Sequence, residues 1–123
     1  MDVKKRCLDT YALVEIAKGN SIFAQHLQQD IIITEITLAE FYGVILREEG
    51  EKMAEQWFQK LNSYSQPVDM KTFIEAVKFR YEHKKKNISF FDAVGYIFSI
   101  RNNLNFVTGD KEFEHFKQVE FKK

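Results

Sequence analysis

Short apolar segments alternate with longer helical patterns along this chain, and no other feature of the sequence limits its possible folds so strongly. The segment 31–33, Ile-Ile-Ile, is β-branched and too short for a helix, so it predicts a buried strand. Further strands are expected to end at residues 7–8 and to cover 66–68, 105–108 and 118–121. Strands separated by helical patterns imply a parallel sheet with helices on both faces. We therefore predict one α/β domain over residues 1–123.

The segments between the strands have the apolar spacing of amphipathic helices. Helices are expected at 11–18, 21–29, 37–47, 51–61 and 71–85, with a helical turn at 111–116. The segment from Phe90 to Ile100 differs, because only Asp92, Gly95 and Ser99 interrupt its apolar residues. A helix that is apolar on nearly all sides is expected to be buried.

Composition excludes several classes of protein. Lys and Arg together number 18, and so do Asp and Glu, so the formal net charge is zero. A neutral chain is not expected to store nucleic acid by bulk charge, but it can still contact nucleic acid at one site. The single cysteine, Cys7, excludes an internal disulfide framework and is typical of a reducing compartment, so we expect a cytoplasmic protein. No run approaches the roughly 20 apolar residues of a membrane span, so no membrane association is expected.

Four acidic residues interrupt or follow the apolar segments: Asp9, Glu40, Asp92 and Asp110. Each has a structural explanation when it is taken alone. Asp9 and Asp110 stand where a helix cap or a turn residue is expected. Glu40 ends a Thr-Leu-Ala-Glu capping-box pattern, and Asp92 ends the related pattern Ser-Phe-Phe-Asp. For any one of the four, capping is the favoured interpretation.

The four acids are more informative together. In a parallel α/β sheet the loops that follow the strands lie at the carboxyl edge, where such folds bind ligands. Carboxylates gathered there repel one another, and a divalent cation relieves that repulsion. Mg²⁺ takes oxygen ligands, keeps several waters and leaves room for a substrate phosphate. Oxygen ligands without a Cys or His pair argue against zinc.

Four motifs in this order resemble the PIN-domain nuclease pattern. They are Leu8-Asp-Thr-Tyr-Ala-Leu, Ile36-Thr-Leu-Ala-Glu40, Ser89-Phe-Phe-Asp-Ala and Phe106-Val-Thr-Gly-Asp110. The resemblance extends from Cys7 to Phe121, and the single-domain length is similar to that of VapC-type toxins of toxin–antitoxin pairs. It implies a three-layer α/β/α sandwich whose parallel sheet of about five strands has the order 3-2-1-4-5.

The resemblance also implies a function and a set of site residues. The implied activity is Mg²⁺- or Mn²⁺-dependent hydrolysis of single-stranded RNA by a homodimer that a small antitoxin protein inhibits. Asp9, Glu40, Asp92 and Asp110 would be the catalytic, metal-binding acids. Thr108 would orient an acid or a water, and Glu114 would support the site. Tyr11 stands where many relatives have a small polar residue, so it is expected to reshape the mouth of the pocket.

Two other features each allow two interpretations. The basic stretch that includes Arg80, Lys84, Lys85 and Lys86 is typical of a solvated helix C-terminus, and the competing interpretation is a surface that steers RNA towards the site. The apolar stripe of Met53, Trp57, Phe58 and Leu61 predicts either internal packing or a groove for the amphipathic helix of a partner.

Alternative functions stay open at this stage. One is a PIN nuclease that processes RNA without being a toxin. Another is a non-catalytic metal-binding or receiver-like domain, although receiver domains usually begin with two adjacent acids and Asp9 follows Leu8 alone. Phosphatases with an aspartate nucleophile need Asp-x-Asp, which the segment Leu-Asp-Thr-Tyr-Ala lacks.

Overall fold

A sheet of five parallel strands forms the centre of the protein, in the order β3-β2-β1-β4-β5. The computed structural model describes residues 5–25 and 30–122. The strands are β1 Arg6–Leu8, β2 Ile31–Thr34, β3 Ser65–Gln66, β4 Asn105–Thr108 and β5 Val119–Phe121. The predicted parallel sheet and its strand order are confirmed. Strand β3 overlaps the predicted segment 66–68 only at Gln66, because Pro67 has no N–H for a ladder hydrogen bond.

Adjacent residues of the two central strands point to opposite faces of the sheet. Cys7 pairs with Phe106 and Leu8 with Val107, and successive side chains of a strand alternate between its faces. Leu8 and Val107 belong to one buried cluster, while Cys7 and Phe106 belong to the other. The two central strands therefore supply both hydrophobic cores.

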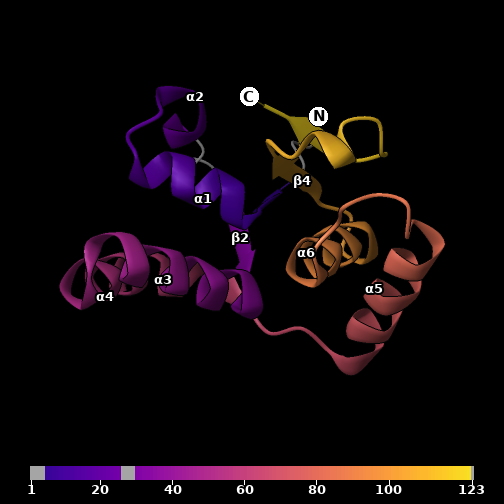
Figure 1. Ribbon diagram of the computed structural model, residues 1–123, viewed down its shortest axis with the longest axis horizontal. Coiled ribbons are helices and arrows are strands. Elements are labelled where there is room, and N and C mark those ends of the chain that lie inside the picture. The colour runs from indigo at the N-terminus through magenta and orange to yellow at the C-terminus, as the bar shows by residue number, and fades with distance from the viewer. Residues whose placement is uncertain (1–4, 26–29, 123) are drawn as a thin grey trace.

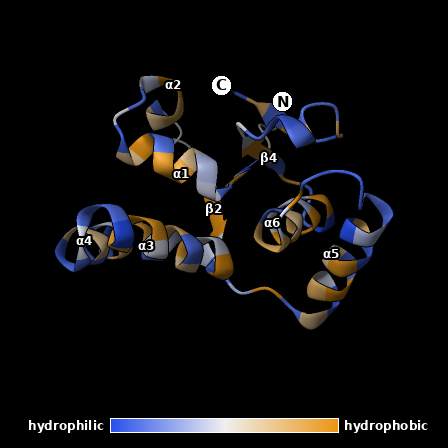
Figure 2. Cartoon of the chain, viewed as in Figure 1, coloured by the Kyte–Doolittle hydropathy of each residue, from blue (hydrophilic) through white to orange (hydrophobic). Residues whose placement is uncertain are grey.

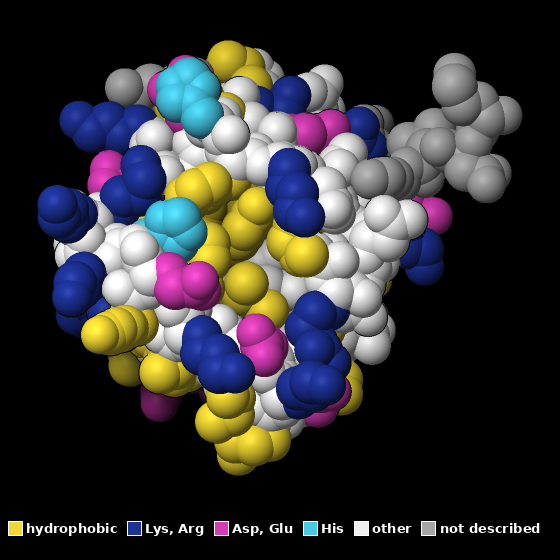
Figure 3. All heavy atoms as spheres, turned by 90° about the vertical axis from the view of Figure 1, so that its right-hand side faces the viewer, with side chains coloured by type: hydrophobic (Ala, Val, Ile, Leu, Met, Phe, Trp, Pro, Cys, Tyr) yellow, Lys and Arg dark blue, Asp and Glu magenta, His cyan; other side chains and the backbone are white. Residues whose placement is uncertain are grey.

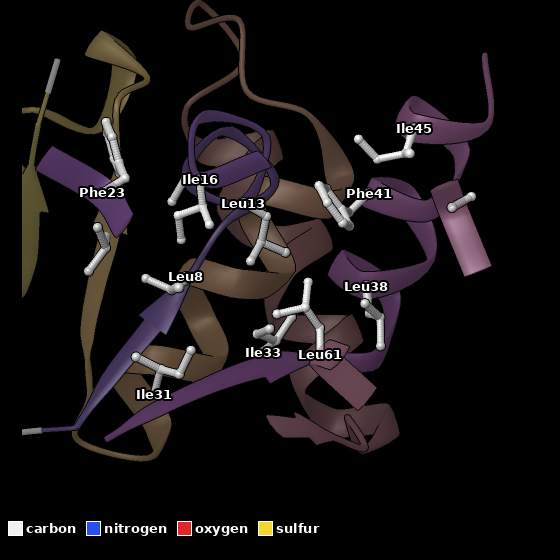
Figure 4. Close-up of a cluster of buried hydrophobic side chains, with 13 residues drawn as sticks. Leu8, Leu13, Ile16, Phe23, Ile31, Ile33, Leu38, Phe41, Ile45 and Leu61 are labelled. Atoms are coloured by element: carbon white, nitrogen blue, oxygen red, sulfur yellow. The ribbon is translucent and has the colours of Figure 1, made fainter. Parts of the chain in front are cut away.

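Four helices cover the first face of the sheet: α1 Thr10–Ala17, α2 Ser21–Ala24, α3 Glu35–Glu49 and α4 Glu51–Leu61. They lie on the left of Figure 1, and their side chains meet the strands in the cluster drawn in Figure 4. Leu13 and Phe41, both 1% exposed, pack there against Leu8 and Ile33 of the sheet. Gly50 separates α3 from α4 with φ 93°, a conformation that glycine adopts without strain.

Helices α5 Met70–Glu82 and α6 Phe90–Arg101 cover the opposite face, on the right of Figure 1. Two short 3₁₀ helices, Asn62–Tyr64 and Lys111–Phe113, precede β3 and β5. Hydrophobic segments of α6 and of β2 lie towards the middle of the molecule in Figure 2. In the part of the chain that is described, no helix is long and apolar enough to cross a membrane.

The start of α3 and the end of α5 differ from the prediction. Helix α3 begins at Glu35, earlier than expected, because the hydroxyl oxygen of Thr34 accepts a hydrogen bond from the Thr37 N–H at 3.2 Å. Helix α5 ends at Glu82, so the following lysines lie outside it. The end expected for the second helix, at 26–29, lies outside the described residues.

The apolar stripe on α4 packs against α3. Trp57 meets Phe41 edge to face with ring centres 6.1 Å apart, and Leu61 is 1% exposed in the core. Phe58 meets Tyr42 in the same way at 6.3 Å, and both also line an open cavity of about 490 Å³ between the two helices. The prediction of internal packing is therefore confirmed, and the outer edge of the stripe borders a groove.

Helix α6 is buried as predicted, and its closest approach to the sheet is at Gly95. Buried positions follow one another from Ala93 to Tyr96. A Cβ atom on Gly95 would lie 2.9 Å from a ring carbon of Phe106, a residue that is itself 0% exposed. Glycine at this position lets the helix lie directly on β4, which carries Asp110 at its end.

Gly95→Ala is expected to lower the free energy of unfolding by about 1 kcal/mol, because crowding of Phe106 outweighs the gain in helix propensity. Gly43→Ala in α3 is the matched control, since a Cβ there would meet only the tip of Arg47 at 3.6 Å. It should raise stability by up to about 1 kcal/mol. Urea unfolding of the two variants measures both effects. Equal stabilisation by both would contradict the close packing of α6 on β4.

Candidate active site

The four acids predicted from the sequence lie together at the carboxyl edge of the sheet. Asp9 follows β1 and Asp110 follows β4, the neighbouring strand. Glu40 is in α3, and Asp92 is in the first turn of α6. Glu40, Asp92 and Asp110 line an open cavity of about 420 Å³, together with Thr10, Tyr11, Gly109 and Lys111. Asp9 is only 1% exposed and lies close enough to Asp92 and Asp110 to interact with both electrostatically.

Asp9 is held by hydrogen bonds to both of its carboxylate oxygens. The backbone N–H of Ala12 donates to Oδ1 at 2.8 Å, which makes Asp9 the N-cap of α1 as predicted. The hydroxyl of Thr108 donates to Oδ2 at 2.5 Å. Thr108 in turn accepts a hydrogen bond from the Asp110 N–H at 3.0 Å, so one hydroxyl group links the ends of the two central strands.

Glu40 is oriented by Thr10, whose hydroxyl donates to its Oε1 atom. The expected capping box with Thr37 is wrong, because Thr34 caps α3 and Thr37 already lies within the helix. The side chain of Glu40 is therefore not used as a cap and reaches the cavity. Since Thr10 directly follows Asp9, the first turn of α1 positions two of the four acids.

Asp92 and Asp110 also lie at helix starts. Ser89 is the N-cap of α6, and its hydroxyl oxygen accepts a hydrogen bond from the Asp92 N–H at 3.1 Å. Asp110 caps the 3₁₀ helix that follows β4, accepting from the Glu112 N–H at 3.0 Å. Helix N-termini favour negative charge, which lowers part of the cost of placing carboxylates here.

Burial and mutual repulsion raise the pKa of two of the four acids. Burial raises the pKa of Asp9 well above its ordinary value, and the charges of Asp92 and Asp110 raise it further against the hydrogen bonds from Thr108 and Ala12. Burial, then Glu40, then Asp110 raise the pKa of Asp92 to about 7. The site therefore disfavours its own full ionisation, and a bound cation would reverse that preference.

The donor set fits a hydrated divalent cation better than a closed metal cage. Within residues 5–25 and 30–122, no three His, Cys, Asp or Glu side chains converge tightly enough to form a ready-made metal site. Mg²⁺ retains several waters and is commonly held by one or two carboxylates plus substrate phosphates. Partly separated acids around an open cavity match that mode of binding.

The other residues predicted for the site, Glu114 and the basic stretch, do not line the cavity. Glu114 is exposed and does not line the cavity, so the structure gives it no contact with the four acids. Arg80 donates from Nε to the Ile88 carbonyl oxygen at 2.9 Å, which ties α5 to the loop before α6. Lys84 lies over the ring of Tyr81, and Lys86 lies over the ring of Phe116. None of these basic residues lines the cavity.

Two cavity residues, Thr10 and Lys111, were not predicted from the sequence. The position of Thr10 directly after Asp9 was a usable signal, because adjacent residues of a first helical turn share one end of the helix. Its partner, Glu40, is 30 positions away, so the hydrogen bond itself could not be foreseen. Lys111 follows Asp110 and gave no signal that separates it from a solvated turn residue.

Asp92→Asn is expected to stabilise the metal-free protein at neutral pH. Below about pH 4 the carboxyl group is protonated in both the folded and the unfolded protein, so its burial carries no charge penalty. The penalty grows as pH rises from about 4, where the group ionises in the unfolded protein, to the folded-state pKa of about 7, and it stays constant above that value. In EDTA, the free energy of unfolding of Asp92→Asn should therefore equal that of wild type at about pH 4. At about pH 8 it should be higher by about 1–2 kcal/mol, a value that allows for the partial solvent exposure of the side chain.

Thermal and urea unfolding across this pH range measure the difference. The control is Asp69→Asn, because hydrogen bonds from Thr72 lower the pKa of Asp69 and its charge therefore favours the folded state. Its effect should have the opposite sign. Millimolar Mn²⁺ should raise the melting temperature of the wild-type protein more than that of Asp92→Asn. An Asp92→Asn difference that does not vary with pH would contradict a raised pKa for Asp92.

Solved structures with a similar fold include a toxin and a toxin–antitoxin complex. VapC20 of Mycobacterium tuberculosis, described as a Sarcin-Ricin loop cleaving toxin, has a TM-score of 0.76 at 16% identity over 94% of this chain and 98% of its own. A toxin–antitoxin complex from Klebsiella pneumoniae has a TM-score of 0.77 at 18% identity, over 94% of this chain and 95% of its own. VapBC2 of Rickettsia felis, bound to a promoter DNA fragment, has a TM-score of 0.76 at 20% identity, over 97% of this chain and 99% of its own. These likenesses establish the fold.

Comparison at the level of sequence gives the family. No curated protein matches the chain significantly. The family model described as PIN domain matches residues 6–119, which include all four acids. Because this match covers most of the chain, the protein belongs to the PIN domain family.

Proposed function

We propose that this protein is a Mg²⁺- or Mn²⁺-dependent endoribonuclease that hydrolyses phosphodiester bonds of single-stranded RNA. The observation that carries the proposal is the group of four carboxyl side chains at one sheet edge, where mutual repulsion and burial raise the pKa of Asp9 and of Asp92. Membership of the PIN domain family, whose members are nucleases, supports the reaction class.

Asp9, Glu40, Asp92 and Asp110 would hold the metal. When it is bound, a divalent cation there supplies Lewis-acid polarisation of the phosphate and lowers the pKa of water. Asp9 is fixed by Thr108 and by the start of α1, so its carboxylate is held in one orientation beside the cavity-lining acids. Glu40 is aimed by Thr10. The chain thus supplies oxygen ligands whose directions are set before substrate arrives.

The bond changes follow from attack by water on phosphorus. An oxygen–phosphorus bond forms, the bond from phosphorus to the 3′ oxygen breaks, and that oxygen takes up a proton. The products carry a 5′-phosphate and a 3′-hydroxyl. The 2′-hydroxyl takes no part in this route, which separates it from ribonucleases that form a cyclic phosphate.

We propose further that the protein is the toxin of a toxin–antitoxin pair, active in the cytoplasm as a homodimer. The support is the fold shared with toxins that were solved together with their antitoxins. A small antitoxin protein is therefore the proposed partner. The exposed side chains of Met70, Ile74, Val77 and Tyr81 recur at helical spacing on α5, a surface that self-association would cover.

Asp9→Asn and Asp92→Asn should each lower kcat/KM for RNA cleavage by about 100-fold or more, because each removes a ligand charge. Labelled single-stranded RNA incubated with Mn²⁺ or with EDTA measures the loss. End-group analysis of the wild-type products should show the 5′-phosphate, and a 2′-deoxy nucleotide at the cleaved position should still be cut.

Asp69→Asn is the matched control for Asp9→Asn. Asp69 caps α5 by accepting from the Thr72 N–H at 2.9 Å, as Asp9 caps α1, but it lies outside the cavity. A loss of cleavage in both variants would show that the lost charge of a helix-capping aspartate, not metal binding, explains the effect at Asp9. Folded Asp9→Asn and Asp92→Asn proteins that cut as fast as wild type would refute the nuclease site. Metal-dependent RNA binding without cleavage would favour a binding domain.

Charge is unevenly distributed along the neutral chain. Residues 69–86 hold six Lys or Arg against three Asp or Glu, while residues 35–61 hold three against six. Figure 3 shows the face that carries α5, with Lys and Arg side chains spread around a central hydrophobic region. We propose that the exposed residues Lys84, Lys85 and Lys86, next to the start of α6, steer RNA towards the cavity. Arg80, bound to Ile88, would hold their loop in place.

Replacing Lys84, Lys85 and Lys86 with Gln should weaken RNA binding and lower the slope of log affinity against log salt by about 2, because up to three phosphate contacts are lost. The control replaces Lys18, Lys52 and Lys60, which are exposed on the helices of the opposite layer and carry the same total charge. Fluorescence anisotropy in Ca²⁺ gives both slopes. If the slope changes equally in the two triple variants, the effect is one of general charge, and the steering role is rejected.

A further inference from the structure

Tyr11 places an aromatic ring at the mouth of the cavity that holds the acids. Its side chain lines the cavity with Glu40, Asp92 and Asp110 and is 38% exposed. The ring is tilted against Phe23, with centres 5.8 Å apart. Phe23 is 0% exposed in the core, whereas Tyr11 lies outside both buried clusters. Tyr11 is therefore supported from below by the core and open to solvent above.

The position of this ring is fixed by its neighbours in the chain. Thr10 donates to Glu40, and the Ala12 N–H donates to Asp9. Tyr11 lies between these two anchored residues in the first turn of α1, so its backbone shares their rigidity. Any group that contacts the exposed side of the ring is consequently held next to the carboxyl group that Thr10 orients.

Gly109 makes room for the ring on the other side of the cavity mouth. A Cβ atom on Gly109 would lie 2.0 Å from Cε1 of Tyr11 and 2.5 Å from Cζ. The backbone of Gly109 does not have a positive φ, so its conformation does not require glycine. Glycine is needed here because the ring of Tyr11 occupies the space that a side chain would fill.

We propose that Tyr11 is a specificity-determining residue on which the nucleobase beside the scissile phosphate stacks. This inference rests on the proposed ribonuclease function. The exposed ring offers a rigid apolar surface at the rim of a cavity whose acids would engage the phosphate. Base–aromatic stacking accepts every base, and the larger rings of a purine give it more overlap than a pyrimidine. The ring would therefore favour a purine at this nucleotide without a hydrogen bond to the base edge.

The test begins with a random pool of single-stranded oligoribonucleotides, whose cleavage sites are read by sequencing in Mn²⁺. Wild-type protein should favour a purine at one nucleotide beside the cut. In a well-cut oligonucleotide from this pool, an abasic site at that nucleotide should raise KM about 10-fold and change kcat less. An abasic site at other nucleotides should have a smaller effect.

Tyr11→Leu keeps an apolar cover for Gly109 and Phe23 but removes the aromatic face. It should raise KM for the intact oligonucleotide about 10-fold and abolish both the purine preference and the added effect of the abasic site. Tyr11→Phe should behave as wild type. The inference is wrong if Tyr11→Leu keeps the full abasic effect, or if Tyr11→Phe loses it, since the hydroxyl and not the ring would then be responsible.

A second measurement needs no variant. The fluorescent base 2-aminopurine, placed at the selected nucleotide, should be quenched when the oligonucleotide binds wild-type protein in Ca²⁺, and no quenching there would overturn the inference. Failure of the function itself is distinguishable. If wild-type protein cuts no RNA in Mg²⁺ or Mn²⁺, the ribonuclease proposal fails and the role of Tyr11 fails with it. If wild-type protein cuts RNA without these base effects, only the role of Tyr11 is rejected.

Discussion

Keeping the carboxyl group of Asp9 buried is the constraint on which the site depends. At 1% exposure, that group is stabilised by the Thr108 hydroxyl and the Ala12 N–H, and both partners belong to elements that begin or end at the same sheet edge. If β1 and β4 were not neighbours, Thr108 could not reach it. The parallel pairing of these strands is thus a requirement of the site as well as of the core. An unpaired carboxylate at this depth would cost several kcal/mol.

Helix capping and the proposed metal binding use the same residues rather than competing for them. Asp9 and Asp110 cap the helices that follow their strands, and Asp92 stands one turn beyond the Ser89 cap. A helix N-terminus favours negative charge, so it is a place where a fold can hold an acid that it otherwise disfavours. Burial, together with repulsion from Glu40 and Asp110, still raises the pKa of Asp92 to about 7. Local capping stabilises the positions, and the remaining strain is electrostatic.

The neutral composition conceals a division of charge that suits this chemistry. The α3–α4 segment is acidic, and the segment from Asp69 to Lys86 is basic. A protein arranged in this way has no bulk attraction for nucleic acid, and its affinity for RNA would depend on one metal-loaded edge and one basic loop. Transient contact with substrate is the expected consequence. Tyr11 would then add a contact with a base, which charge alone cannot supply.

Much of the fold and of the proposed site could be predicted from the sequence. Strand-to-helix alternation indicated the parallel sheet, and the apolar segment around Gly95 indicated a buried helix, because both depend on local spacing. The start of α3 was mispredicted, because the Thr-Leu-Ala-Glu pattern placed the cap at Thr37, whereas Thr34 caps the helix. Tertiary packing decided between them: Thr34 ends a strand that pairs in the sheet, so the helix begins there.

What the sequence determined by itself was the order of strands and helices along the chain and the four acids placed at their junctions. Periodicity and capping act between residues a few positions apart, so a single segment carries those signals. Tertiary structure decided which acids meet, which hydroxyl groups hold them, and that Tyr11 lies over Gly109. Thr108 reaches Asp9 across 99 positions of chain, and Thr10 reaches Glu40 across 30. Such contacts exist only after the sheet has brought the strand ends together, because no local pattern encodes the distance between them.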